Sequence, residues 1–485
     1  MSKIVILGAG IAGHTAASHL RRKLSKKHEV LVVSPNRNYQ WVPSNIWVGI
    51  GRMKSEDVFF PLEPLYKRKG IGYKQAKVVS FHPEGDATEP KPFVKVEYLY
   101  GEMLGMQEKV TYDFLINATG PKLAFELTEG LNPGTNKAYS VCTYDHATHA
   151  SAALHELINK IKSTQKKAKI LIGTGHAKAT CQGAAFEYIL NVEKELVKFK
   201  VRDKVEITWI SNENELGDFG MDGMLLSYQN QVMKSSEMVE MVFADRGIKW
   251  ILGAGIQKVE DGKVSYENLE GEHLTEEFDF AMLIPAFSGH GFKAFDKANE
   301  DITAKLFKGF MIVDADYSPK PYEEWSVQDW PETYQNPSYN NIFAPGIAFA
   351  PPHSISKPRK SKNGTEIFPA PPRTGMPSGI TAKLVADNII DTINGAKTLH
   401  HKGSMGNMGA ACIASAGYGL SKGSGISITT FPIVPDYNKY PETHGRELKK
   451  TFGDIGLAGH WLKLSLHYAF IYKAKMKPFW WLIPE

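Results

Sequence analysis

Cysteine is scarce in this chain, and its scarcity excludes one class of protein at once. The 485 residues include three cysteines, Cys142, Cys181 and Cys412, which lie far apart in the sequence. Three such residues cannot form the dense disulfide framework of a small secreted domain. They are therefore either small buried apolar residues or reactive thiols, and their neighbours must decide between the two.

Long apolar runs and a strong excess of one charge are also missing. No stretch approaches the roughly 20 apolar residues of a membrane-spanning helix, and no secretion signal precedes the first predicted strand. The net charge is only +5, so it does not argue for a nucleic-acid partner. We expect a chain that is made without an export signal, does not cross a membrane and binds neither nucleic acid nor a metal ion.

The chain does contain a glycine-rich turn close to its start. Residues 4–7 read as a buried strand, and Gly8, Gly10 and Gly13 follow at the G-x-G-x-x-G spacing. The first glycine permits a tight turn, the second lets backbone approach a pyrophosphate, and the third allows the next helix to pack closely on the strand. Amide groups around Ala12, at the start of that helix, are suited to phosphates. A second strand follows, so the order predicts a dinucleotide-binding βαβ unit.

Further residues are predicted to line the same nucleotide site. Ser34 stands where an acidic residue usually ends the second strand, and its hydroxyl can still form one hydrogen bond. The other candidates lie in an aromatic segment typical of a loop over a flat ligand, after a buried strand, or at the start of a later helix. These candidates are Pro43, Ser44 and Asn45; Ala118, Thr119 and Gly120; Gly346; and Thr374 and Gly375.

A second strand-plus-glycine unit occupies residues 169–183, but its phosphate loop is altered. Lys178 stands where the third glycine should fall, so the close approach that a pyrophosphate requires is lost. We predict an α/β fold with two Rossmann-like dinucleotide-binding domains and a C-terminal amphipathic helical membrane-attachment region. The expected boundaries are 1–165 with 290–400 for the first domain, 166–289 for the second, and 401–485 for the C-terminal region.

The last 25 residues combine apolar, aromatic and basic side chains. Apolar and aromatic residues dominate 461–472, lysines follow them, and Trp480 and Trp481 come near the end. This composition is typical of an interfacial amphipathic helix, although a helix docked on the protein core would show the same pattern. The tryptophans favour the membrane interface. We therefore expect a peripheral membrane protein, with the membrane face left open.

These residues and their local contexts resemble the sulfide:quinone oxidoreductases of the flavin disulfide reductase superfamily. The similar segments span nearly the whole chain: 8–13, 39–49, 117–120, 140–147, 181–187, 341–346, 412–414 and the tail. The resemblance implies FAD at the first nucleotide site and a redox-active pair formed by Cys181 and Cys412. It also implies sulfide as the substrate and a membrane quinone as the electron acceptor, bound against the C-terminal helices. A homo-oligomer is left open.

The resemblance also implies roles for single residues. Cys142 is similar to a third family cysteine that is implicated in sulfur release. Glu187 resembles an acid/base near the flavin, His146 a histidine near the sulfide entrance, and Lys473 a tail residue at the cofactor. A second histidine carried by some members is absent, because Asp218 lies in the corresponding segment.

Three other interpretations share parts of this pattern. A type II NADH:quinone oxidoreductase has the same fold, FAD, quinone and tail, but it needs an intact second dinucleotide loop, and Lys178 argues against that. The flavoprotein subunit of a sulfide dehydrogenase with a cytochrome partner would use the cysteines but not the tail. The third is a non-catalytic, membrane-attached flavoprotein sensor. The resemblance favours an enzyme that oxidises sulfide to sulfur or polysulfide through a cysteine disulfide or persulfide and passes two electrons to quinone.

Overall fold

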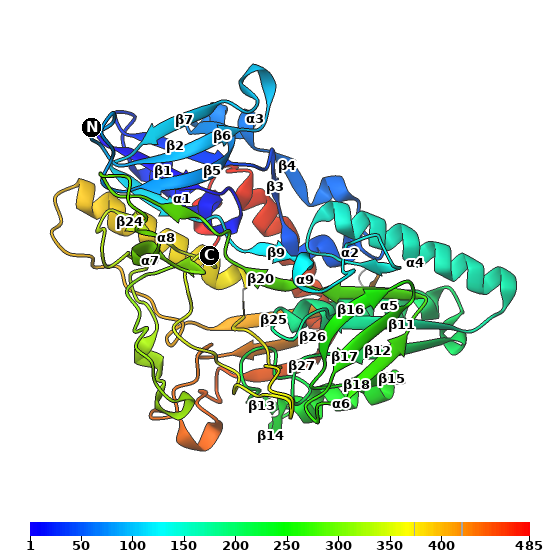
Figure 1. Cartoon of the computed structure of the whole chain (residues 1–485). Helices are drawn as coiled ribbons and strands as arrows, with labels where there is room; N and C mark the ends of the chain where they lie inside the picture. Colours follow the sequence, from blue (N-terminus) through cyan, green and yellow to red (C-terminus); the bar gives the residue numbers. More distant parts are fainter. Residues whose placement is uncertain (373, 419–420) are drawn as a thin grey trace.

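The computed structural model describes residues 1–372, 374–418 and 421–485. Two mainly parallel sheets, each flanked by helices, lie at the upper left and at the right of Figure 1, and a third, largely antiparallel sheet lies at the lower centre. The mixed α/β architecture with a C-terminal helix confirms the predicted fold class. The domain boundaries expected from the sequence stay a prediction.

The first sheet is built around strand β1 and carries the glycine-rich turn. Its central strands are parallel: β1 pairs with β2 on one side and with β8 on the other. The side chains of these strands are buried on both faces of the sheet. In spatial order the strands are β24 (Ile342–Phe343), β8 (Phe114–Asn117), β1 (Lys3–Leu7), β2 (Glu29–Ser34), β5 (Gly72–His82), β6 (Phe93–Tyr98) and β7 (Gln107–Thr111), with β21 (Lys293–Ala294) beside β5. Helices α1 (Ile11–Lys23) and α8 (Gly375–Ile393) pack against each other, and α3 (Leu62–Lys69) packs on β5.

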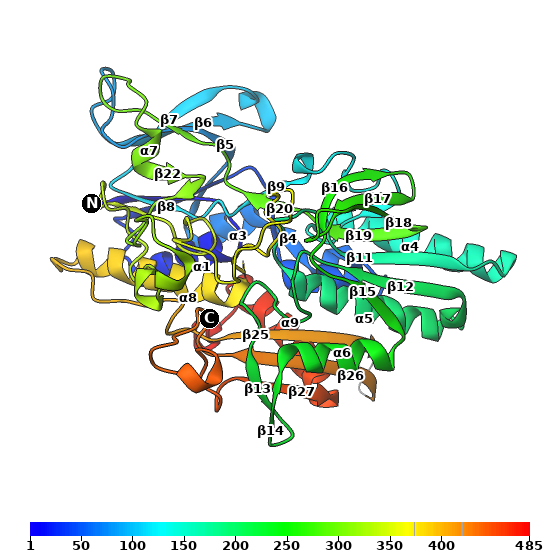
Figure 2. The same cartoon turned by 60° about the horizontal axis from the view of Figure 1, so that its bottom comes forward.

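The second sheet is entirely parallel and carries the altered dinucleotide loop. Its strands are β10 (Ala138–Tyr139), β19 (Phe280–Ile284), β11 (Ala168–Thr174), β12 (Val205–Ile210) and β15 (Ile248–Ile251). The helices of this part are α4 (Tyr144–Thr164), α5 (Gln182–Lys198) and α6 (Ser235–Asp245). A three-stranded antiparallel sheet, β16 (Gly255–Glu260), β17 (Lys263–Glu267) and β18 (His273–Glu277), lies close to it (Figure 2).

The third sheet was not predicted from the sequence. Its strands are β14 (Gln231–Lys234), β13 (Leu225–Tyr228), β27 (Phe452–Gly456), β26 (Lys422–Thr430) and β25 (Ala410–Tyr418). Helix α9 (Leu457–Ala474) packs on β25 and β26. Short elements complete the fold: α2 (Asn45–Val48), α7 (Thr303–Leu306), β3 (Asn38–Gln40), β4 (Phe59–Pro61), β9 (Lys122–Ala124), β20 (Ala286–Ser288), β22 (Phe307–Lys308) and β23 (Phe310–Met311).

Helix α9 is the main helical element of the expected membrane-attachment region. In the three described ranges of the chain, none of the helices has both the length and the apolar character that crossing a bilayer requires.

Candidate active site

The turn between β1 and α1 forms an open cradle for a ligand. Gly8 has a φ of +94°, and a Cβ there would lie 2.3 Å from the carbonyl oxygen of Ala118. A Cβ on Gly13 would lie 2.1 Å from the carbonyl oxygen of Gly8. Both glycines are therefore required by backbone packing. A Cβ on Gly10, in contrast, would meet no atom within 4 Å. The cradle lies at the start of α1, whose first turn has no acidic residue and no side-chain cap.

The start of α8 meets the start of α1 at this cradle. Gly346 has a φ of +76°, and a Cβ on it would lie 2.8 Å from the Cβ of Ala12. A Cβ on Gly375 would lie 3.0 Å from Ile11 Cδ1. Thr374 is the N-cap residue of α8 and makes no capping bond through its side chain. Two helix N-termini thus converge, and this arrangement fits a dinucleotide with anionic phosphates and an electron-rich ring.

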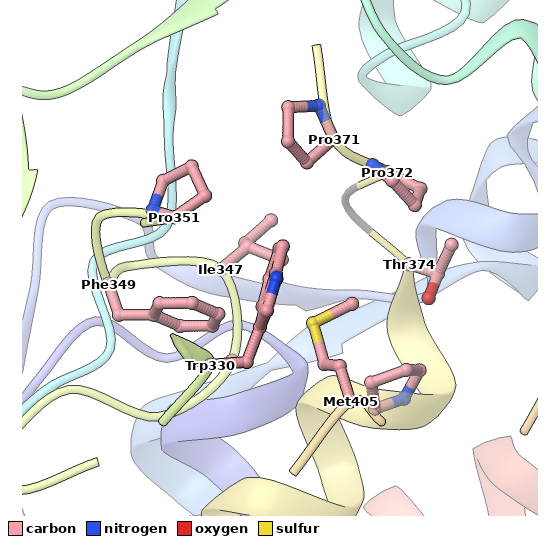
Figure 3. A pocket seen from close by; sticks show the side chains of 10 residues that line it. Trp330, Ile347, Phe349, Pro351, Pro371, Pro372, Thr374 and Met405 are labelled. Atoms are coloured by element: carbon pink, nitrogen blue, oxygen red, sulfur yellow. The ribbon is translucent and has the colours of Figure 1, made fainter. Parts of the chain in front are cut away.

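A small apolar cavity lies beside the start of α8 (Figure 3). Trp330, Phe349 and Met405 form part of its wall, and Pro371 and Pro372 come from the loop that precedes the helix. The sequence analysis did not single out these wall residues. Thr374 is the polar residue among those that line this cavity, so the cavity adjoins the cradle on a mostly apolar side.

Two of the predicted cofactor residues are already partly engaged within the protein. Ser34 is fully buried, and its Oγ accepts the amide of Asn36 at 3.2 Å, which leaves its own hydroxyl proton to donate. Thr119 Oγ1 donates to Asn117 Oδ1 at 2.8 Å. Gly120, with a φ of +69°, has open space where a Cβ would lie. These positions follow strands β2 and β8 at the edge where α1 begins.

The segment with Pro43, Ser44 and Asn45 joins the cradle to other parts of the chain. Ser44 Oγ lies 2.9 Å from His467 Nδ1 of α9. Asn45 Nδ2 donates to the carbonyl oxygen of Val141 at 3.1 Å, and Asn45 Oδ1 is buried with no partner among the described residues. A buried acceptor of this kind is normally satisfied, so it suits a ligand donor.

Lys473 holds the end of the chain in place. Its ammonium group donates to the carbonyl oxygens of Ile483 (2.7 Å) and Pro484 (2.9 Å) and pairs with Glu485 Oε1 at 2.8 Å. The same carboxylate oxygen lies 2.7 Å from His19 Nε2 of α1. An ammonium group has three protons to donate, and these three acceptors can use them all. The predicted role of Lys473 at the cofactor stays a prediction.

Cys181 and Cys412 come from distant parts of the sequence, are both present as thiols in the structure, and lie close enough for Cys181 to influence the pKa of Cys412. Cys181 is the N-cap residue of α5, and Cys412 lies on β25. A Cβ on Gly183 would lie 2.7 Å from Cys412 Sγ, so this sulfur sits over the first turn of α5. The pKa of the Cys412 thiol is raised to about 11. Burial is the largest cause, Glu187 and Cys181 also raise this pKa, and Lys463 lowers it.

Glu187 lies six residues after Cys181 on α5 and forms a buried ion pair. Its Oε2 lies 2.9 Å from Lys463 Nζ of α9, with the two side chains 6% and 13% exposed. Its Oε1 accepts the amide of Ser415 at 3.1 Å. Burial raises the pKa of Glu187, and Lys463 is the strongest influence that lowers it. Elements α5, β25 and α9 therefore meet at one charged pair beside Cys412.

The inner face of α9 is polar, which the sequence analysis missed. His460, Lys463 and His467 are spaced at i, i+3 and i+7 and share one face of the helix. Each meets a different element: His460 Nδ1 lies 2.8 Å from Ser415 Oγ, Lys463 pairs with Glu187, and His467 meets Ser44. The spacing of these three residues in the sequence was the signal from which the polar inner face could have been predicted. The outer side of α9 exposes Trp461, Leu462, Tyr468 and Tyr472, and the segment after the helix exposes Phe479, Trp481 and Leu482.

Cys142 and His146 lie together at the start of α4. The amide of Cys142 donates to Ser140 Oγ at 3.1 Å, and burial raises the pKa of its thiol to about 11. His146 packs edge-on against Phe125 at 5.6 Å, and burial lowers its pKa. These contacts do not by themselves join either residue to the Cys181 and Cys412 pair, and both roles stay predictions. In the described part of the chain, no three His, Cys, Asp or Glu side chains form a metal-binding group.

Comparison with known families agrees with this geometry. The family of pyridine nucleotide-disulphide oxidoreductases matches residues 2–318, and the chain belongs to that family. Membership implies a flavin cofactor, which fits the cradle between α1 and α8. Within the family, the chain is similar to the sulfide-quinone reductase of Aquifex aeolicus, with 27% identity over 472 residues, 97% of this chain and 91% of that protein. The predicted resemblance to sulfide:quinone oxidoreductases is confirmed.

Solved structures are also similar to this chain. The sulfide:quinone oxidoreductase from Aquifex aeolicus superposes with a TM-score of 0.73 at 26% identity and covers 98% of this chain and 92% of that one. The structure of NDH2 from Plasmodium falciparum in complex with NADH has a TM-score of 0.63 at 13% identity and covers 98% and 96%. The second likeness shows a shared fold alone.

Proposed function

We propose that the chain is an FAD-dependent sulfide:quinone oxidoreductase. It oxidises hydrogen sulfide to sulfur or polysulfide and passes two electrons to a membrane quinone. The observation that carries the proposal is the meeting of Cys181 and Cys412 beside the Glu187–Lys463 ion pair. This sulfur pair lies in a chain that resembles a sulfide-quinone reductase over 97% of its length.

The cofactor assignment rests on the two helix N-termini at the cradle. The turn from Gly8 to Gly13 and the start of α8 at Gly375 would hold the dinucleotide. When bound, FAD supplies the two-electron relay between the sulfur centre and the quinone. The residues around it determine where sulfide attacks and where protons go.

A disulfide between Cys181 and Cys412 provides the electrophilic sulfur that hydrosulfide needs. Attack forms a new S–S bond to one cysteine, which becomes a persulfide, and breaks the bond between the cysteines. The other cysteine leaves as a thiolate with the electron pair of the broken bond. The ammonium group of Lys463 lowers the pKa of Cys412 and so favours its thiolate.

Glu187 is suited to hold the proton that this chemistry moves. The Cys412 thiol has a pKa of about 11, so a free thiol there stays protonated at neutral pH without a base. Burial raises the pKa of Glu187 above its ordinary value of 4.5, so this carboxyl group takes up a proton more readily than an exposed glutamate does. Lys463 fixes the carboxylate at 2.9 Å and compensates its charge while it is ionised.

Helix α9 provides a route to the membrane. Its outer side exposes Trp461, Leu462 and Tyr468, and Phe479 and Leu482 extend this apolar surface beyond the helix. Such a surface is typical of a segment that lies in the interface between lipid and water. We infer a peripheral membrane protein whose quinone pocket lies between the cofactor and the inner face of α9.

Three alternatives are less well supported. A type II NADH:quinone oxidoreductase requires a working second dinucleotide loop, but Lys178 occupies that loop and pairs with Glu366 at 2.9 Å. A sulfide dehydrogenase subunit that delivers electrons to a cytochrome leaves the exposed apolar side of α9 without a purpose. A non-catalytic sensor of the same fold would show no steady turnover with quinone.

Anaerobic mixing of the flavin-loaded protein with sulfide tests the proposal. We expect sulfide to bleach the flavin absorbance and a soluble quinone to restore it over repeated cycles. Bleaching by NADH instead would favour the NADH:quinone oxidoreductase. If sulfide bleaches the flavin and cytochrome c restores its absorbance while quinone does not, the sulfide dehydrogenase would be favoured. No bleaching by either donor would overturn the proposal.

A further inference from the structure

The altered dinucleotide loop is covered by a segment from far along the chain. This segment, the strap (residues 360–372), runs beside loop residues 176–180, which directly precede Cys181. Three hydrogen bonds join strap and loop: Phe368 N to Ala177 O (3.1 Å), Ala370 N to Ala179 O (3.3 Å), and Thr180 Oγ1 to Pro371 O (3.2 Å). The last two residues of the strap, Pro371 and Pro372, also line the cavity at the start of α8 (Figure 3).

Lys178 fastens the strap to the loop. Its Nζ lies 3.3 Å from the centre of the Phe368 ring and 2.9 Å from Glu366 Oε2. Phe368 is only 6% exposed, so the ammonium group meets an aromatic face that is shielded from water. The ammonium group is attracted both to the aromatic face and to the carboxylate beside it, and together these contacts fix its position. The lysine that replaces a phosphate-loop glycine thus has a structural partner.

The backbone that follows this loop is held in an uncommon conformation. Cys181 has a φ of 71° and a ψ of 35°, in the left-handed region that residues other than glycine rarely adopt. Such a residue keeps this conformation only when its surroundings hold it. The strap holds the loop on one side. On the other side Asn212 Nδ2 donates to the carbonyl oxygens of Ala177 and Ala179, both at 3.0 Å.

We propose that Lys178, Glu366 and Phe368 form a clamp that positions the sulfur of Cys181 against Cys412. The clamp rests on the proposed function and extends it, because none of its three residues belongs to the sulfur centre. With the clamp released, residues 176–180 separate from the strap and Cys181 relaxes toward an ordinary φ. Its side chain, at the N-cap of α5, then turns away from the Cys412 sulfur, which lies over the first turn of that helix.

The test compares Lys178→Ala with Lys178→Arg in the flavin-loaded full chain. Lys360→Ala is the matched control, since Lys360 reaches the same carboxylate of Glu366 at 3.7 Å from the solvent side. Stopped-flow mixing with sulfide gives the limiting rate of flavin bleaching, and mixing the reduced protein with a soluble quinone gives the rate of reoxidation. We expect Lys178→Ala to lower the limiting bleaching rate at least tenfold while reoxidation stays within twofold of wild type. Lys178→Arg should recover most of the loss, because arginine also stacks on aromatic faces.

A second measurement does not depend on sulfide. The reduced proteins are treated with diamide, and formation of the Cys181–Cys412 disulfide is followed by thiol labelling and mass spectrometry. We expect wild type and Lys360→Ala to form it quickly and Lys178→Ala to form it several-fold more slowly. If Lys178→Ala forms the disulfide as fast as wild type, the clamp is wrong. If sulfide bleaches no variant but the disulfide rates differ as expected, the clamp stands and the proposed function fails.

Discussion

Replacing Lys463 with methionine keeps the size of a buried side chain and removes its charge. The substitution leaves the Glu187 carboxylate, 6% exposed, without its ion-pair partner. Breaking a buried pair in this way typically costs about 3–5 kcal/mol. The amide of Ser415 still donates to Glu187 at 3.1 Å, so we expect a loss near the lower end, about 3 kcal/mol.

The loss should depend on pH, and its direction follows from Glu187. Burial already raises the pKa of this carboxyl group, and removing Lys463 raises it further. A carboxyl group whose pKa is higher in the folded state contributes full stability below its ordinary pKa of 4.5 and loses it as pH rises through the raised value. The deficit of Lys463→Met should therefore be small at about pH 5 and large at about pH 8.5.

Thermal unfolding of the flavin-loaded protein in detergent measures this deficit. The chain of 485 residues has an unfolding entropy of roughly 1 kcal/mol/K if it unfolds as one unit, so about 3 kcal/mol lowers Tm by about 3 °C. The double variant Lys463→Met/Glu187→Gln removes the buried charge and should recover most of the loss at high pH. Lys160→Met, on the exposed side of α4, is the control. An equal deficit at both pH values, or no recovery in the double variant, would refute the reasoning.

The same substitution should move the pKa of Cys412. Lys463 lowers this pKa and Glu187 raises it, so Lys463→Met and Glu187→Gln should shift it in opposite directions. The measurement is the pH dependence of iodoacetamide labelling at Cys412, read by mass spectrometry in chains where Cys142 and Cys181 are serine. The labelling profile should move to higher pH in Lys463→Met and to lower pH in Glu187→Gln. Shifts in the same direction would contradict the geometry.

Three further results are expected. Cys181→Ser and Cys412→Ser should keep the flavin but lose sulfide-dependent quinone reduction by orders of magnitude, because a hydroxyl cannot form the disulfide; full activity in Cys412→Ser would rule out the sulfur mechanism. NADH should not bleach the flavin of the wild type, because Lys178 and the strap occupy the second dinucleotide loop, and rapid bleaching by micromolar NADH would reverse this view. Leu462→Gln combined with Leu482→Gln should lower sedimentation with lipid vesicles at least tenfold, since each buried leucine contributes roughly 1.5–3 kcal/mol; unchanged sedimentation would place the membrane contact elsewhere.

Local backbone chemistry made the two dinucleotide units predictable. The helix expected to start at Thr374 and Gly375 is α8, Gly375–Ile393. Strands β1 and β19 are apolar runs of the kind that marks a buried parallel strand, and the first of them was expected at residues 4–7. The glycines at 8 and 13 could be assigned because their requirement comes from contacts within one short turn and its neighbouring strand.

The third sheet could not be predicted, because its residues are small to make room for a helix that lies far away in the sequence. Strands β25 and β26 are rich in glycine, alanine and serine, which gives little strand signal. A Cβ on Gly425 would lie 2.3 Å from the amide nitrogen of His460, and one on Gly423 would lie 2.4 Å from its imidazole ring. Small residues are needed there because α9 lies directly on the sheet. The sequence alone contains no sign of that contact, so Cys412 could not be placed on a strand.

The C-terminal helix shows why composition left two interpretations open. A docked helix and an interfacial helix both need one apolar and one polar side, and α9 turns its polar side inward. Lys463 pairs with Glu187 and His467 meets Ser44, while Leu462 and Tyr468 are exposed. Removing the helix would leave Glu187 and Ser44 without these partners, so lost quinone reduction in a truncated chain would not separate membrane attachment from damage to the sulfur centre. Substitutions on the outer side of α9 leave the buried pairs intact, so they test membrane attachment without damage to the sulfur centre.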